Sequence, residues 1–196
     1  MAVTKFTNSE LTGTQKYVSM LAGNPAYEGP GAFVPIASAT PNGTGVTFDN
    51  IPQNYQHLQI RIMGKRNTTS SPSSIFMTFN NVATGTPYDY HYISANGSTL
   101  FASGQASANF FLLESGLTSN DATNTFGVGI IDIHDYASTT KNKTLRAIVG
   151  QDRNGAGNIS LNSALFRSTN AITRIDFGVI TYSAGTVISL YGVKGA

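Results

Sequence analysis

The sequence predicts an all-β protein, an antiparallel β-sandwich of jelly-roll-like form with about ten strands. Many short stretches alternate apolar and polar residues with a period of two, which is the pattern of a strand with one buried face. Turn residues, among them Asn-Gly pairs and prolines, separate these stretches. No regular alternation of strands with helical stretches is present, which argues against a parallel-sheet enzyme fold.

The clearest strand lies within the segment GVTFDNIPQNYQHLQIRIMG (45–64). Leu58, Ile60 and Ile62 point to one side of an extended chain, and the polar residues between them point to the other. Pro52 cannot donate a ladder hydrogen bond, so the polar connection before this strand is expected to form a corner. We therefore expect two antiparallel strands joined across that corner.

The same pattern predicts further strands along the chain, except that 109–114 is apolar throughout and is expected to be buried on both faces or covered by the arm. Gly127 and Gly129 alternate with apolar residues, which indicates close approach by another backbone. The loops expected to face outward are 65–74, 115–124 and 151–158. The strands expected besides 57–63 are 33–39, 46–48, 75–79, 88–92, 109–114, 126–131, 144–149, 159–166, 172–181 and 187–193.

The first 30 residues differ from the rest. Thr14–Leu21 is long enough for a two-turn helix, which is too short to be stable alone, and a Gly- and Pro-containing connection follows. We interpret residues 1–30 as an arm for attachment or subunit contact, and residues 31–196 as the sandwich domain.

Composition limits the classes of function. The chain has 196 residues, enough for one domain with a sizeable core. Charged residues make up 11% against about 25% in an average protein, and neutral polar residues replace them. This suits a protein whose surface is covered by neighbours in an assembly. The absence of cysteine excludes disulfides and thiolate metal sites.

The sequence contains no apolar segment of signal-peptide or membrane-spanning length, so we expect no membrane span. Any export is then expected by another route, such as release in a particle. The net charge of +2 comes from twelve dispersed basic residues. We expect no nucleic-acid partner, because nucleic-acid binding needs clustered cations. The closest approaches to a cluster are Lys65 with Arg66, and Lys141 with Lys143 and Arg146.

The sequence IIDIHDY suggests one metal site. Asp132 and His134, two residues apart on a strand, share a face and could ligate a divalent metal, with His91 as a further ligand. The alternative, which we favour, is a strand end at which Asp135 caps the following turn. We expect no cofactor.

Tyr88, Tyr90 and Tyr92 form a tyrosine stripe on one side of a strand. Such rings can stack on sugars, which makes the stripe a candidate glycan site. The favoured alternative is packing in the core or at a subunit contact. No serine elbow, carboxylate pair or phosphate-binding loop is recognisable, so we expect no catalytic residue.

Three stretches together resemble a known group. They are FDNIPQNYQHLQIRIMG (48–64), IIDIHDYASTTKNKTLRAIVG (130–150) and TNAITRIDFGVITYSAGTVISLYGVKGA (169–196). The chain from about residue 45 to 196 is similar to the β-sandwich virion structural proteins and tail fibre proteins of tailed bacteriophages of aquatic bacteria. His134 departs from that group, in which an aliphatic residue often stands at this position.

The resemblance implies a jelly-roll-like module on the outside of a virion, commonly a homotrimer, assembled in the bacterial host cytoplasm. We therefore expect a non-enzymatic structural protein that associates with itself and with other virion proteins of the capsid or tail. It would be a capsid decoration protein or a tail fibre or tail tip component, and in the tail it could also serve host attachment. The alternative is a carbohydrate-binding adhesin or a polysaccharide-hydrolysing domain.

Overall fold

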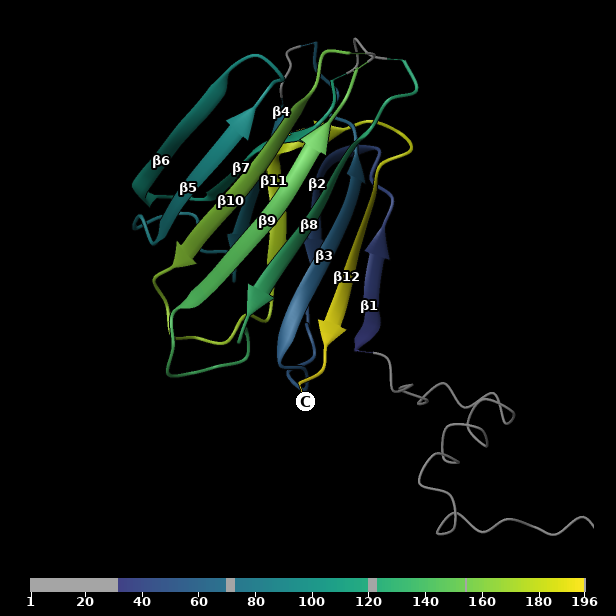
Figure 1. The fold of residues 1–196 in the computed structure, drawn as a ribbon. Helices are drawn as coiled ribbons and strands as arrows, with labels where there is room; N and C mark the ends of the chain where they lie inside the picture. Colours follow the sequence, from purple (N-terminus) through teal and green to yellow (C-terminus); the bar gives the residue numbers. More distant parts are fainter. Residues whose placement is uncertain (1–31, 70–72, 120–122, 154, 196) are drawn as a thin grey trace, which may run out of the picture.

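The protein is a sandwich of two antiparallel sheets, as the sequence predicts (Figure 1). The structure is a computed structural model, and it describes residues 32–69, 73–119, 123–153 and 155–195. The expected arm 1–30, with its two-turn helix, lies outside the described residues.

The larger sheet has eight strands and forms the front layer in Figure 1. Its strand order is β1-β12-β3-β8-β9-β10-β5-β6, with every neighbouring pair antiparallel. In that order the strands are β1 (Phe33–Ala39), β12 (Val187–Val193), β3 (His57–Gly64), β8 (Gly127–His134), β9 (Lys143–Gln151), β10 (Asn158–Phe166), β5 (Tyr88–Ala95) and β6 (Leu100–Ala108).

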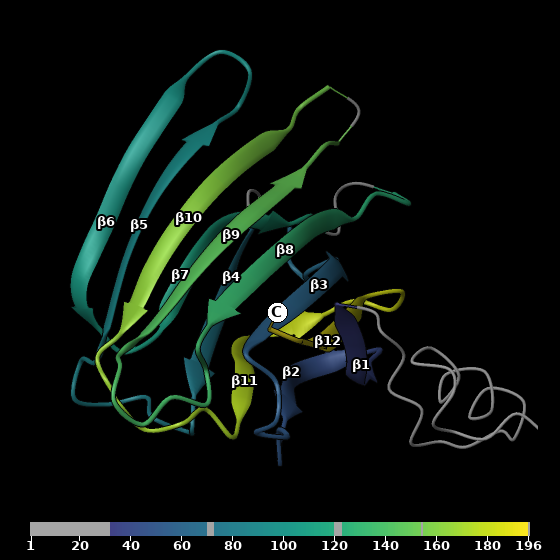
Figure 2. The same cartoon turned by 60° about the horizontal axis from the view of Figure 1, so that its bottom comes forward.

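The smaller sheet has four strands and covers one face of the larger sheet, as the turned view in Figure 2 shows. Its β7 contacts β5, β10, β9, β8 and β3 of the larger sheet. In sheet order its strands are β2 (Gly43–Phe48), β11 (Ile175–Tyr182), β4 (Ser73–Phe79) and β7 (Phe111–Leu117).

The core lies between the two sheets. The alternation predicted for 57–63 is confirmed, because Leu58, Ile60 and Ile62 point inward and are buried. Aromatic rings fill the space beneath β5 and β10, where the Tyr88 ring stacks on Phe166 with centroids 4.9 Å apart. Burial of these apolar faces is the main source of stability for a sandwich of this size.

The structure has one strand that the sequence pattern did not predict. Strand β6, LFASGQASA, is rich in Ala, Ser and Gly and shows no alternation of burial, because nearly every residue in it is exposed. It forms through pairing with β5 across a turn at Asn96 and Gly97, where Asn96 Oδ1 accepts a hydrogen bond from Thr99 N at 2.8 Å. The turn was predicted, but not the strand after it.

The expected outward loops are correct only in part. Strand β7 extends to Leu117, and the whole stretch 115–119, placed by the sequence in an outward loop, is buried. Lys65, at the start of another expected loop, is also largely buried. A polar residue type therefore gave a misleading signal of exposure here, since Ser and Thr are neutral and can be buried with hydrogen bonds.

The expected close backbone approach is confirmed at Gly127. A Cβ atom added there would lie 2.6 Å from the carbonyl oxygen of Gly116 in β7. At Gly129 the closest atom is instead a side-chain carbon, Val149 Cγ1 at 2.8 Å. Glycine at position 127 thus lets strand β8 lie against β7.

We expect Gly127→Ala to lower the free energy of unfolding by about 1–3 kcal/mol, because the methyl group would force two backbones apart. Urea denaturation measures the change. The control is Gly178→Ala, since a Cβ at Gly178 meets no atom within 4 Å. Equal destabilisation by the two substitutions would contradict the role of close packing at Gly127.

Candidate assembly surface

The outer face of the eight-stranded sheet is unusually apolar. Strands β8, β9 and β10 carry aliphatic residues on both faces, so their alternation buries one set and leaves the other set outside. Ile148, Ile159 and Leu161 remain 59%, 61% and 55% exposed. Isolated exposed aliphatic residues are common on proteins, but a contiguous group marks an interaction surface.

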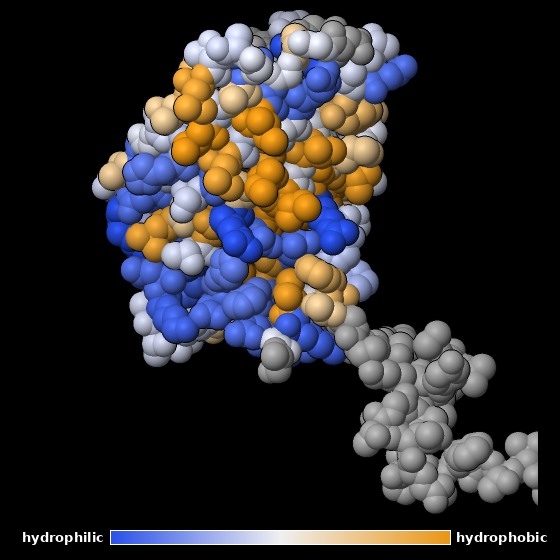
Figure 3. All heavy atoms as spheres, in the orientation of Figure 1, coloured by the Kyte–Doolittle hydropathy of each residue, from blue (hydrophilic) through white to orange (hydrophobic). Residues whose placement is uncertain are grey.

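Strand register gathers these side chains into one group. Ile130 of β8 pairs with Ile148 of β9, which pairs with Leu161 of β10, and Leu161 pairs with Ile93 of β5. Figure 3 shows the apolar residues as a continuous area over these strands. We define the aliphatic patch as Met63, Ile93, Leu100, Val128, Ile130, Ile148, Ile159 and Leu161.

A polar row runs along one margin of the aliphatic patch. Asp132 Oδ1 accepts a hydrogen bond from Gln59 Nε2 at 2.9 Å, and Asp132 Oδ2 lies 3.4 Å from Arg146 Nε. Arg61 Nε donates to Gln59 Oε1 at 3.0 Å. Both signs of charge are therefore present at the margin, whereas the patch itself carries none.

Five of the eight residues of the patch line an open hollow of about 1280 Å³. Val128, Ile130, Ile148, Ile159 and Leu161 line it, and the polar row closes one side. A hollow with an aliphatic floor suits the apolar side chains of a partner. The side chains of that floor carry no polar group that could fix the orientation of a small polar ligand, and the polar side chains of the lining stand at its margins.

The tyrosine stripe lies on the opposite, inner side of β5. Tyr88 is fully buried, and its hydroxyl donates to Val82 O at 2.7 Å and accepts from Phe79 N at 2.9 Å. Burial raises the pKa of Tyr88 to about 12, since the phenolate would be poorly solvated there. No face of the Tyr88 ring is open to a sugar.

Tyr90 and Tyr92 follow Tyr88 along the inner side of β5. Tyr90 is 7% exposed, and its hydroxyl lies 2.9 Å from Gln105 Oε1. Tyr92 is partly buried and packs against the core. The geometry places the stripe chiefly in the core, which was the favoured alternative, and leaves only Tyr92 with part of its ring accessible.

The residues considered for a metal site do not come together. Asp132 and His134 share the outer face of β8, but Asp132 is engaged by Gln59 and Arg146. His91 is three strands away from β8, or about 14 Å at ~4.8 Å per strand, whereas ligands of one metal ion lie within about 4 Å of each other. Among the described residues no group of three His, Asp or Glu side chains could hold a metal ion.

Strand β8 ends at His134, and Asp135 begins the turn that follows, so the strand end expected by the favoured alternative is confirmed. The φ of Asp135 is 47°, a left-handed conformation that Asp tolerates, and its backbone N–H donates to His57 Nδ1 at 2.9 Å. The His57 and His134 rings meet edge to face 5.0 Å apart. Lys141 Nζ, 2.7 Å from Asp135 Oδ2, is the main cause of a lowered pKa of the Asp135 carboxyl group.

The basic residues near 141–146 form no open cluster. Lys143 is fully buried, where its ammonium group donates to Lys141 O at 2.6 Å and Thr169 O at 3.1 Å. Burial lowers the pKa of Lys143. Lys141 and Arg146 each contact an aspartate. Lys143 therefore joins two loops and offers no charge to a polyanion.

The sequence itself contains a signal for the aliphatic patch. Stretches such as RAIVG and ISLNSAL carry apolar residues at both odd and even positions. A two-sided apolar strand is expected only where both sheet faces are covered. Because the smaller sheet covers one face, the second set of apolar residues needs a partner.

We expect Asp135→Asn to lower stability at neutral pH by less than about 1 kcal/mol, because it removes a solvent-exposed ion pair. A carboxyl group with a lowered folded pKa stabilises the fold above its ordinary pKa and loses this effect as pH falls through the folded value. The difference from wild type, measured by thermal denaturation, should therefore vanish in strong acid. A difference independent of pH would contradict the ion-pair explanation.

Comparison with known proteins adds no relative: no family model, no curated protein and no solved structure matches this chain. Within the described residues, no helix is long and apolar enough to cross a membrane. The function must therefore be argued from the geometry above.

Proposed function

We propose that this chain is a non-enzymatic structural protein of a tailed bacteriophage virion. It assembles with copies of itself, as a homotrimer in keeping with the resemblance, and with other virion proteins of the capsid or tail. It is displayed on the particle as a capsid decoration or as a tail fibre or tail tip component. The observation that carries the proposal is the aliphatic patch on a surface otherwise poor in charge.

The aliphatic patch favours a protein partner over a sugar. Sugars stack on the flat faces of aromatic rings, and the patch consists of Ile, Leu, Val and Met. The tyrosines that could serve a glycan point chiefly to the core on the other side of β5. Host surface glycan remains a partner only for a component at the tail tip, and Tyr92 is the accessible ring of the stripe.

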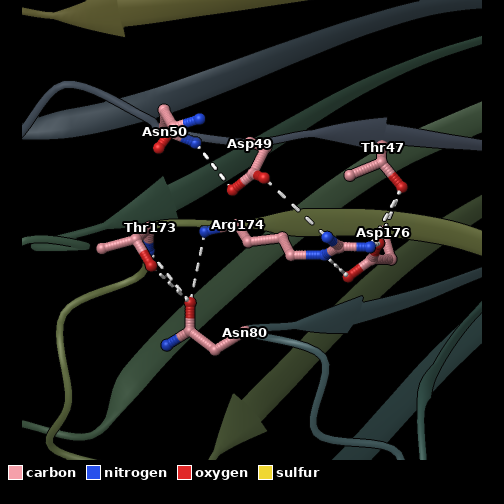
Figure 4. A network of polar contacts seen from close by, with 7 residues as sticks. All are labelled: Thr47, Asp49, Asn50, Asn80, Thr173, Arg174 and Asp176. Atoms are coloured by element: carbon pink, nitrogen blue, oxygen red, sulfur yellow. Dashed lines mark hydrogen bonds and ion pairs between the residues drawn. The ribbon is translucent and has the colours of Figure 1, made fainter.

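The acidic side chains serve the framework. Arg174 contacts Asp176 at 2.6 Å and Asp49 at 3.9 Å on the outer side of the smaller sheet (Figure 4). Asn80 Oδ1 in the same network accepts from Thr173 N at 2.9 Å. Asp89, Asp132 and Asp135 also hold salt bridges. Carboxylates paired in this way hold connections in place, which agrees with a structural role.

The neutral polar surface supports assembly for an energetic reason. Burying a Ser, Thr or Asn side chain against a neighbour costs less desolvation free energy than burying Lys or Glu. Charged residues are 11% of the chain. Contacts can therefore form over much of this surface without leaving unpaired charges inside them.

We expect the purified chain to associate at micromolar concentration, because the aliphatic patch is costly to leave in water. Light scattering should give a mass that is a multiple of the 20.7 kDa of one chain. A stable monomer would count against self-assembly.

The virion location has a test of its own. Antibodies raised against the chain should label intact particles of the phage that encodes it, and labelling on capsid or tail would separate the two placements. Particles that carry no label and contain none of the chain by mass spectrometry would overturn the proposal.

A further inference from the structure

We infer that the aliphatic patch is the contact surface on which a second copy of this chain packs. The inference rests on the proposed function, and it goes further by naming the surface and its occupant. Eight aliphatic side chains lie together on one sheet face, each from 44% to 70% exposed. A contiguous group of exposed aliphatic side chains of this extent is typical of interaction surfaces, since the largest apolar patch on a typical monomer is only about 300–600 Å² and is often functional.

The available area matches the needs of a stable protein interface. Eight strands at ~4.8 Å and about eight residues at ~3.3 Å give the outer face an area on the order of 1000 Å². A standard interface buries about 800 Å² on each partner. One copy can therefore cover the patch and its margins.

The chemistry of the face is that of an interface core with a polar rim. The patch has no charged member, and depletion of charge is typical of the centre of an interface. Asp132 and Arg146 stand at its margin with 26% and 69% of their side chains exposed. Since the margin carries both signs of charge, a second copy can meet Arg146 with an acidic group and Asp132 with a basic one.

A second copy fits the patch better than the first 31 residues of the same chain. That segment precedes Ala32 at the sheet edge and could reach about 100 Å if extended, so its length would suffice. Its expected two-turn helix, however, presents only Tyr17, Val18 and Leu21 on one side. The other large apolar residues of the segment are interspersed with polar residues and glycines, namely Val3, Phe6, Leu11, Met20 and Tyr27. The folded surface of another copy, in contrast, is large enough to cover all eight side chains at once.

Strand β6 extends the argument to the edge of the sheet. Leu100 in β6 belongs to the patch and is 70% exposed, and β6 contains no charged residue and no proline. Natural sheets usually protect an edge strand with such residues. An edge without them, continuous with an apolar face, is expected where a neighbouring subunit lies against the sheet.

The test introduces charge at the centre of the patch in the full-length chain. Ile148→Asp combined with Leu161→Asp should raise the apparent dissociation constant of the assembly on the order of a hundredfold or more. Light scattering measures the mass across a dilution series. Circular dichroism and thermal denaturation verify the fold, which should be retained because both side chains point to solvent. The matched control, Thr44→Asp, lies on the exposed side of the smaller sheet and should leave the mass unchanged.

A second experiment does not depend on a disruptive variant. The chain has no cysteine, so Ile148→Cys introduces a single thiol at the centre of the patch. When the Ile148→Cys variant, otherwise unchanged, is assembled, this thiol should react with a maleimide at least about tenfold more slowly than the thiol of the assembled Thr44→Cys variant. The two rates should become similar when the assembly is dissociated by dilution.

The outcomes separate this inference from the proposed function. If the wild-type chain is a monomer, self-assembly fails and the inference fails with it. If the chain assembles, but the double Asp variant keeps the same mass and the thiol at position 148 reacts as fast as that at position 44, only the inference is overturned. A thiol at position 148 that is protected in a monomer would assign the patch to the chain's own first 31 residues and would also overturn it.

Discussion

The structure depends on a mismatch between its two sheets. A β-strand places its side chains on two faces, and a sandwich covers only one face of each sheet. In this protein a four-stranded sheet covers the inner face of an eight-stranded one, and strands β8, β9 and β10 carry aliphatic residues on both faces. The inner residues form the core. The outer aliphatic residues form the aliphatic patch, so the core of the single chain is fully covered, whereas this part of its surface stays exposed to solvent until a partner covers it.

The mismatch also explains which polar groups lie inside and which lie at the margin. Lys143 is buried because β9 turns it inward beneath two loops, whose carbonyl oxygens bind its ammonium group. Arg146, three residues later, points outward and lies beside Asp132 at the margin of the patch. Cations close in sequence therefore have unrelated roles, because one contributes to the framework and the other borders the surface that we assign to contact between copies.

Several features followed from local rules. Alternating or apolar stretches between turn residues indicated eleven of the twelve strands in the described part of the chain. A half-covered strand has apolar residues at every second position, which made 57–63 the clearest of them. Gly127 signalled a close backbone approach, and Asn96 with Gly97 signalled a turn. Strand β6 gave no such signal, since a strand exposed on both faces has no alternation to display. Asp135 was expected at a strand end because Asp favours turns, and its left-handed conformation in the structure is one that Asp tolerates.

By itself, the sequence determined the all-β class, the positions of most strands and the scarcity of charge, since each depends on residue type or on spacing along the chain. Only the tertiary structure decided which side of each strand faces the second sheet, because periodicity gives two sides without naming the inner one. That choice buried Tyr88 and Tyr90 and put Ile148, Ile159 and Leu161 on the outside. The strand order placed His91 three strands from Asp132. These placements depend on strand order and register between residues far apart in the chain, which no local pattern specifies.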